Sequence, residues 1–361
     1  MTVDLTSLDN AQRLLFAVPL KPLQGQRFQP TGFPNLGAAT YRTKEGQSLL
    51  VESAQSMANR LEMTIWDEAS QDVKASLQGL SHVRVLRGKG NSETERNNSS
   101  QQDRNFFTDS ITESHRINSP YIMFAKDGED KELFDIFGQR LNAFEIGPLP
   151  ARRDIAGFLL KWDVGSLLHG VFLSATKGKG NSLAGGRLRI SRAISSFIEA
   201  DGVRVAASGG VKNDHVNPSG DTKNGFGNVP FARDEFTADS ITLYVNLDLA
   251  QIRGYGLDAD AQKLLILLAL YKLRALLGDN LRLRTACDLQ VATDVIKATQ
   301  PADFSLPSLA DLLAALRSAI AACSSLMTVA EVIYNDDLKK GKEEESPDAS
   351  ETNNSVESET V

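Results

Sequence analysis

The order of strand-like and helix-like segments restricts the fold of this chain more than any other feature of its sequence. Apolar or alternating runs predict strands at 13–20, 167–174, 241–249 and 281–289. Helices are predicted at 53–61, 190–200, 258–277 and within 307–334. With the insertions set aside, the order is strand, helix, strand, strand, helix, strand. This α+β order is that of the ferredoxin-like unit, which RNA-recognition-motif domains share and many functions use.

The distribution of charge leaves room for a nucleic-acid partner. The chain has 361 residues and a net charge of −7, of which −6 lies in residues 336–361. This acidic tail contains almost no apolar residue and is predicted to be disordered. The remaining residues are close to neutral and create no overall basic field, so any nucleic-acid binding would require a local groove.

The composition also favours a cytoplasmic protein without a membrane partner. The most apolar run, 264–277, contains Lys272 and Arg274 and is too short to cross a bilayer. No secretory signal is recognisable at the start of the sequence. The two cysteines, Cys287 and Cys323, cannot form a disulfide framework or a four-cysteine zinc site, and they suit a reducing compartment.

Two polar segments are predicted to lack regular structure. Residues 88–105 contain no hydrophobic side chain, which predicts an exposed, mobile loop. Residues 208–230 contain five glycines and two prolines in 23 positions. Lys212, Asn213 and His215 supply hydrogen-bond donors there, and Phe226 supplies an apolar side chain. This segment is either a surface loop or one that reaches around a partner.

The predicted helix at 53–61 has an unusual polar face. Its apolar residues repeat every three or four positions and would dock on a sheet. Neutral amides and hydroxyls beside one cation suit phosphate and sugar contacts, which carry no base identity. The alternative is an ordinary solvated face. The candidate RNA-binding residues of this helix are Ser53, Gln55, Ser56, Asn59 and Arg60.

Arginines elsewhere supply further candidate phosphate contacts. Arg27 stands in a long loop beside Phe28, which either pins the loop to the body or flanks a ligand. In the sequences RLRI at 187–190 and LRLR at 281–284, arginines alternate with apolar residues, so each pair faces one side of a strand. Arg282 and Arg284 would therefore line a phosphate groove or form surface ion pairs.

Catalytic constellations are poor in this sequence. None of the four histidines, His82, His115, His169 and His215, has metal-ligand spacing to another histidine or a cysteine. His169 lies in an apolar segment and is expected to be structural. No nucleophile elbow is present. We therefore expect a non-catalytic protein with no cofactor and no metal site.

Seven segments resemble one known family, in order, over about residues 11–290. The sequence resembles the backbone subunit of a Type I-G (formerly I-U) CRISPR Cascade, in the Cas-seven group of the RAMP superfamily. The matching segments are RFQPTGFPNLGAATY at 27–41, LVESAQSMANRLE at 50–62, LLHGVFL at 167–173, GGVKND at 209–214, GFGNVPF at 225–231, NLDLAQIRGYG at 246–256 and LRLRTACDL at 281–289.

The resemblance implies a hand-shaped protein with a modified RNA-recognition-motif palm, a fingers insertion and a thumb hairpin. Several copies would polymerise along the spacer of a CRISPR RNA, and target DNA would pair with that RNA, so that base pairing supplies sequence specificity. Neighbouring copies and other Cascade subunits would be partners. The implied parts are palm at 11–74, 161–202 and 237–290, fingers at 75–160 and thumb at 203–236. The C-terminal helices expected at 291–335 and the tail at 336–361 fall outside the resemblance.

Two other functions remain open at this stage. A RAMP endoribonuclease would process precursor RNA with a histidine base, for which His169 and His215 are the candidates. A generic single-stranded RNA binder would need no CRISPR context. The endoribonuclease differs from a non-catalytic subunit because it cleaves RNA. The generic binder differs because its copurified RNA would not have one defined length.

Overall fold

A mixed α+β fold is built on a curled, seven-stranded antiparallel sheet. The computed structural model describes residues 3–33, 37–142, 151–177, 181–182, 188–278 and 281–338. Along the sheet, the strands follow the order β18-β19-β1-β17-β14-β5-β4. Their bounds are β18 Leu281–Arg284, β19 Cys287–Val291, β1 Arg13–Pro22, β17 Ser240–Asp248, β14 Ile194–Asp201, β5 Gly46–Glu52 and β4 Thr40–Thr43.

Helices cover one face of this sheet. Alternate residues of β1 and β17 are buried, among them Phe16 and Leu243, while the residues between them are half-buried or exposed. Helix α1 (Ala54–Met63) packs on β14 and contacts α8 (Ala259–Gly278), which in turn packs against α7 (Leu249–Gly254) and α9 (Leu309–Ala322). In chain order the central elements are therefore β1, α1, β14, β17, α8 and β19.

The second strand of the predicted ferredoxin-like unit lies at a different place in the chain than expected. The predicted helix at 190–200 is wrong, because this region contains strand β14, whose residues alternate between buried and half-buried. The small residues Ser196 and Ala200 at buried positions hide that alternation in the sequence. The predicted strand at 167–174 is also largely wrong: helix α6 (Val164–His169), buried along its whole length, ends at Gly170 before the short strand β10 (Val171–Leu173).

The predicted fourth strand, 281–289, is instead a hairpin. Strand β18 turns into β19 at Ala286, which has a positive φ of 59°. Only β19 pairs with β1, so β18 forms the edge of the sheet. The uninterrupted apolar alternation of the sequence conceals this turn.

A long two-stranded hairpin leaves the sheet where irregular structure was predicted. Strands β15 (Arg204–Lys212) and β16 (Val229–Thr237) pair without interruption from Arg204↔Thr237 to Lys212↔Val229. Its tip is also ordered, because the Asp214 carboxylate accepts hydrogen bonds from the backbone N–H groups of Val216, Asn217 and Gly227. A side chain at Gly227 would collide with the backbone of Gly220, so glycine permits this closure.

A second, three-stranded sheet lies beyond the other end of α1. Its order is β20-β8-β9, with β20 (Val329–Ile333) parallel to β8 (His82–Arg87), and β9 (Asn105–Asp109) antiparallel to β8. The helix predicted within 307–334 is α9. The expectation of C-terminal helices at 291–335 did not include β20, through which this segment joins the small sheet. The surrounding helices are α3 Pro120–Met123, α4 Leu133–Asn142 and α5 Arg152–Trp162.

The predicted loop at 88–105 is docked rather than free. It forms the short helix α2 (Glu93–Asn97), which Ser92 and Glu95 cap reciprocally. Arg96 is buried and donates to the backbone oxygen of Asn335 at 2.7 Å and to the carboxylate of Asp337. Ion pairing thus holds a segment that lacks apolar side chains. Residues 339–361, most of the predicted disordered tail, lie outside the described residues.

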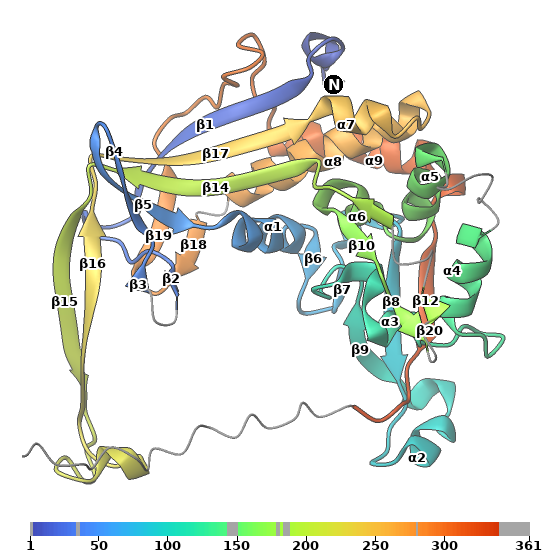
Figure 1. Cartoon of the computed structure of the whole chain (residues 1–361), viewed down its shortest axis with the longest axis horizontal. Helices are drawn as coiled ribbons and strands as arrows, with labels where there is room; N and C mark the ends of the chain where they lie inside the picture. Colours follow the sequence, from blue (N-terminus) through green and yellow to red (C-terminus); the bar gives the residue numbers. More distant parts are fainter. Residues whose placement is uncertain are drawn as a thin grey trace, which may run out of the picture.

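These parts form two arms on either side of α1 (Figure 1). The hairpin β15–β16 projects from one end of the large sheet, and the small sheet with α2 projects from the other. Within the described residues, no helix is long and apolar enough to cross a membrane. The remaining strands are β2 Gly32–Phe33, β3 Gly37–Ala38, β6 Trp66–Asp67, β7 Asp72–Val73, β11 Thr176–Lys177, β12 Asn181–Ser182 and β13 Leu188–Ile190.

Candidate nucleic-acid interface

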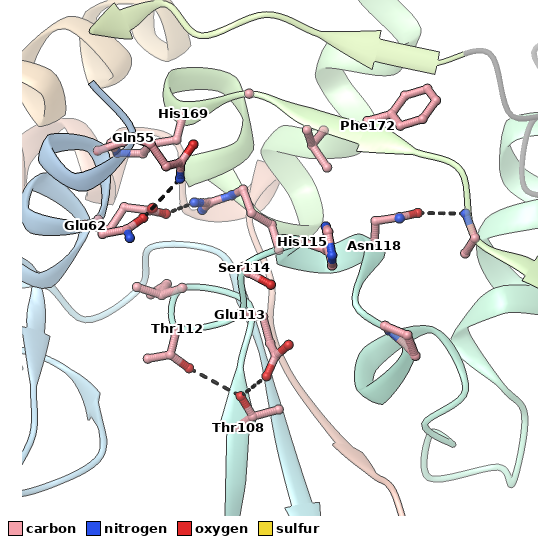
Figure 2. Close-up of a pocket in the computed structure, with 18 of the residues that line it drawn as sticks. Gln55, Glu62, Thr108, Thr112, Glu113, Ser114, His115, Asn118, His169 and Phe172 are labelled. Carbon is pink, nitrogen blue, oxygen red and sulfur yellow. Dashed lines mark hydrogen bonds and ion pairs between the residues drawn. The ribbon is translucent and has the colours of Figure 1, made fainter. Parts of the chain in front are cut away.

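A groove of about 1010 Å³ follows the polar face of α1. One wall is α1 with Gln55 and Asn59, and the other is formed by residues 106–118 together with β10 and the end of β13 (Figure 2). Met57 and Leu61 point the other way, into the core, as the helical spacing predicts. The sequence therefore places the amide-rich face of α1 toward an open groove.

The amides of α1 form a short chain of hydrogen bonds along this groove. The Arg192 guanidinium donates to the side-chain oxygen of Gln55, and Gln55 Nε2 donates to Asn59 Oδ1 at 3.4 Å. Amide groups retain further donor and acceptor positions in such an arrangement. The chain ends at an arginine that forms no ion pair with any described residue, so this face can contact phosphate or ribose.

The acidic side chains of the groove are largely engaged within the protein. Glu62 pairs with Arg116, which is buried and also pairs with Asp163 at 2.9 Å. Glu113 accepts hydrogen bonds from the hydroxyls of Thr108 and Ser119. Arg116 thus compensates the charge of Glu62. Glu113, by contrast, is held by neutral hydroxyls, and Glu68 is exposed at the groove.

His169, which lines the groove, contacts a buried lysine that does not. His169 Nε2 lies 2.9 Å from Lys272 Nζ, and both side chains are almost fully buried. Burial, together with the charge of Arg116, lowers the pKa of Lys272 to about 7. Burial and the neighbouring Lys272 hold the pKa of His169 well below its usual value. His169 is thus packed inside the protein, as the sequence predicted for a structural histidine, although in a helix and not a strand.

Four of the predicted RNA-binding residues have structural contacts within the protein. Three of them contact the buried carboxylate of Glu52, and the fourth caps α1. The Glu52 side chain, 1% exposed, contacts Ser56 and pairs with Arg60 and Arg284. Arg60 also donates to the backbone oxygens of Arg282 and Leu283. Ser53 caps the start of α1 by accepting from Ser56 N. Ser53, Ser56, Arg60 and Arg284 therefore hold α1 against the edge of the sheet.

Arg27 and Arg282 line a second hollow, of about 670 Å³, at the base of the hairpin. Arg282 is 83% exposed and lies 3.8 Å from Asp288, while Arg27 pairs with Glu235 at 3.6 Å. Phe28 is fully buried and exchanges two backbone hydrogen bonds with Phe236. The interpretation that Phe28 pins its loop to the body is therefore confirmed. The side chain of Phe33 lies outside the described residues.

The other predicted residues lie at the far end of the hairpin. Lys212, Asn213, His215 and Phe226 are all exposed there, and Phe226 is 56% exposed. They line neither the groove nor the hollow. The structure thus divides the predicted residues into a groove set, a hollow set, a hairpin-tip set and a set that positions α1.

The sequence analysis did not identify the wall opposite α1. His115 is exposed in the groove, and Phe172 stands at its rim (Figure 2). Arg189, the cross-strand partner of Phe172, also lines the groove. Only the RLRI alternation at 187–190 pointed to Arg189, and Arg187 lies outside the described residues. His82 is instead buried, 2.7 Å from Asp109. No group of three or more histidine, cysteine, aspartate or glutamate side chains among the described residues could hold a metal ion.

Comparison with known proteins identifies the family. The family model described as CRISPR-associated protein GSU0053 (Cas_GSU0053) matches residues 14–205, just over half of the chain. The chain belongs to this family. The match includes β1, α1, β14 and the small sheet except β20, and it ends at the start of the hairpin. This is a CRISPR-associated protein, and the groove described above lies almost entirely within the matched residues.

Other comparisons add little to the Cas_GSU0053 assignment. No curated protein matches the sequence. A chain of a solved structure entitled "CRISPR RNA-guided surveillance complex, pre-nicking" aligns with 79% of this chain and 76% of its own length. The two share 14% sequence identity with a TM-score of 0.33, which is too low to define a common fold.

Proposed function

We propose that this Cas_GSU0053 protein is the non-catalytic, RNA-binding backbone subunit of a Type I-G Cascade. Several copies polymerise along the spacer of a CRISPR RNA and present it for pairing with a target DNA strand. Its partners are the CRISPR RNA, neighbouring copies of the same chain, other Cascade subunits and, through the RNA, the target DNA. The family assignment and the sequence resemblance over residues 11–290 support this role.

The observation that carries the proposal is the open polar face of α1 between two arms. In this proposal the large sheet with α1 and α8 is the ferredoxin-like palm. The small sheet and its helices are the fingers, to which the C-terminal segment adds β20, and the hairpin β15–β16 is the thumb. RNA lies along Gln55 and Asn59 and continues toward Arg27 and Arg282.

The exposed tip of the hairpin supplies the contact between neighbouring copies. Lys212, Asn213 and His215 offer donors to phosphate or 2′-hydroxyl groups, and Phe226 offers a surface beside a base. Because the hairpin forms its own two-stranded ladder, its end can be removed without disturbing the large sheet. Loss of the tip should therefore impair assembly more than folding.

The test is to replace residues 209–231 with a short Gly/Ser link. The mass of the RNA-bound particles is then measured by light scattering. We expect a folded protein that no longer forms multi-copy assemblies on RNA. The matched control replaces the exposed turn at 128–131 in the same way and should leave assembly intact. Full-sized assemblies from the hairpin variant would refute the proposed role of the hairpin.

A further inference from the structure

The rim of the groove opposite α1 carries an exposed aromatic ring covered by an arginine. Phe172 and Arg189 are direct partners across the ladder β10–β13, and both point away from the core. The Arg189 guanidinium lies 4.9 Å from the centre of the Phe172 ring. Phe172 is 42% exposed, which makes it the most exposed of the described aromatic side chains that line the groove.

The charges around this pair favour an anionic ligand. Arg189 makes no hydrogen bond or ion pair with any described residue, so its charge is uncompensated at the rim. Arg192, on the same wall, is bound only to the neutral Gln55 within the part of the chain that the structure describes. Of the acidic side chains that line the groove, Glu62 is paired with Arg116. Glu113 lies in the 106–118 wall and Glu68 follows β6, so neither belongs to the segments that carry Arg189 and Arg192.

From this geometry we infer that Phe172 and Arg189 form a stacking platform for an unpaired RNA base at the mouth of the groove. An aromatic face beside a cation is the combination that single-stranded nucleic acid uses, since the base stacks on the ring and the adjacent phosphate meets the guanidinium. The inference rests on the proposed RNA-binding function. It adds two RNA-binding residues, Phe172 and Arg189, that belong neither to α1 nor to the hollow nor to the hairpin. Figure 2 shows Phe172 standing apart from the hydrogen-bonded residues of the groove.

The first experiment measures stacking directly. The full chain is titrated into a short single-stranded RNA that carries 2-aminopurine, whose fluorescence is quenched on stacking. We expect Phe172→Leu to weaken RNA binding about five- to a hundredfold and to reduce the quenching. Phe172→Tyr, which keeps the ring, should restore both. The matched control Tyr41→Leu removes an aromatic of similar exposure that does not line the groove, and it should bind RNA as the wild type does.

The second experiment needs no variant. Photocrosslinking of the wild-type chain to RNA that contains 4-thiouridine, followed by mass spectrometry, should give crosslinks at Phe172. Crosslinks confined to other residues would refute the platform, as would unchanged affinity and quenching in Phe172→Leu. Wild-type protein that binds no RNA would instead refute the proposed function, so the two failures are distinguishable.

Discussion

Replacing Glu52 with glutamine should destabilise the protein more than the loss of any exposed ion pair. The Glu52 carboxylate is buried and faces two guanidinium groups, those of Arg60 and Arg284. Glutamine keeps the shape of the side chain but removes its charge, so two partly buried cations would then face each other without an anion. The predicted RNA-binding role of Arg60 can be judged only after this structural role has been measured.

The expected loss can be worked from the geometry. Arg60 Nε lies 3.4 Å from Glu52 Oε1. At an effective dielectric constant of about 20, such a pair attracts by about 5 kcal/mol before desolvation is subtracted. Breaking a buried pair costs about 3–5 kcal/mol in the free energy of unfolding. For a chain of this length, that loss corresponds to a fall of about 4–7 °C in the midpoint of thermal unfolding.

The assay is calorimetry together with urea unfolding of the wild type and Glu52→Gln. The matched control is Asp239→Asn, which removes the charge of an exposed ion pair with Arg204, 2.8 Å long. Solvent screens that pair, so its loss should leave the unfolding midpoint nearly unchanged. If Glu52→Gln loses no more stability than this control, the argument that burial sets the strength of the Glu52 cluster is wrong.

Three further predictions concern the buried lysine, the C-terminal segment and catalysis. Lys272→Met should raise the free energy of unfolding by about 1–4 kcal/mol near pH 6.5. In the folded state the pKa of Lys272 is lowered to about 7, so this gain in stability should shrink as the pH rises from about 7 to about 10. Urea unfolding near these two pH values measures the gain, and an equal gain at both would contradict the prediction. Removal of residues 339–361 should leave limited trypsin cleavage at Arg96 unchanged, whereas removal of 335–361 takes away partners of Arg96 and should open cleavage there. Equal cleavage at Arg96 in the two truncations would contradict the docking. Repeat RNA incubated with the wild type should stay intact with or without divalent metal, and specific cleavage that His115→Ala or His215→Ala abolishes would support a RAMP endoribonuclease instead.

The sequence predicts those parts of the fold in which hydrophobic periodicity is clear. Strand β17 and helix α1 follow from alternation and helical spacing, and Gln55 and Asn59 of the predicted polar face do line the groove. Strand β1 and helix α8 follow instead from their apolar runs, and the length of the second run indicates a helix. Strand β14 was missed because Ser196 and Ala200 occupy buried positions. Helix α6 was taken for a strand because it is buried on all sides and shows no helical periodicity.

Contacts between distant segments could not be predicted in this way. The docking of 88–105 depends on Arg96 meeting Asn335 and Asp337, which are more than 200 positions away. The hairpin β15–β16 forms despite its glycines because each strand supplies backbone partners to the other. At the candidate site, the sequence identified Arg60 and Arg284 as cations but not their common partner Glu52, because only the fold brings the three together.

The central claim is that copies of this chain assemble along RNA. The most direct measurement is native mass spectrometry of the wild-type protein on a series of single-stranded RNAs of increasing length. The account predicts that the number of bound copies rises in integer steps, each after the same number of added nucleotides and for unrelated RNA sequences alike. A single copy on every length, or no bound RNA at all, would contradict it.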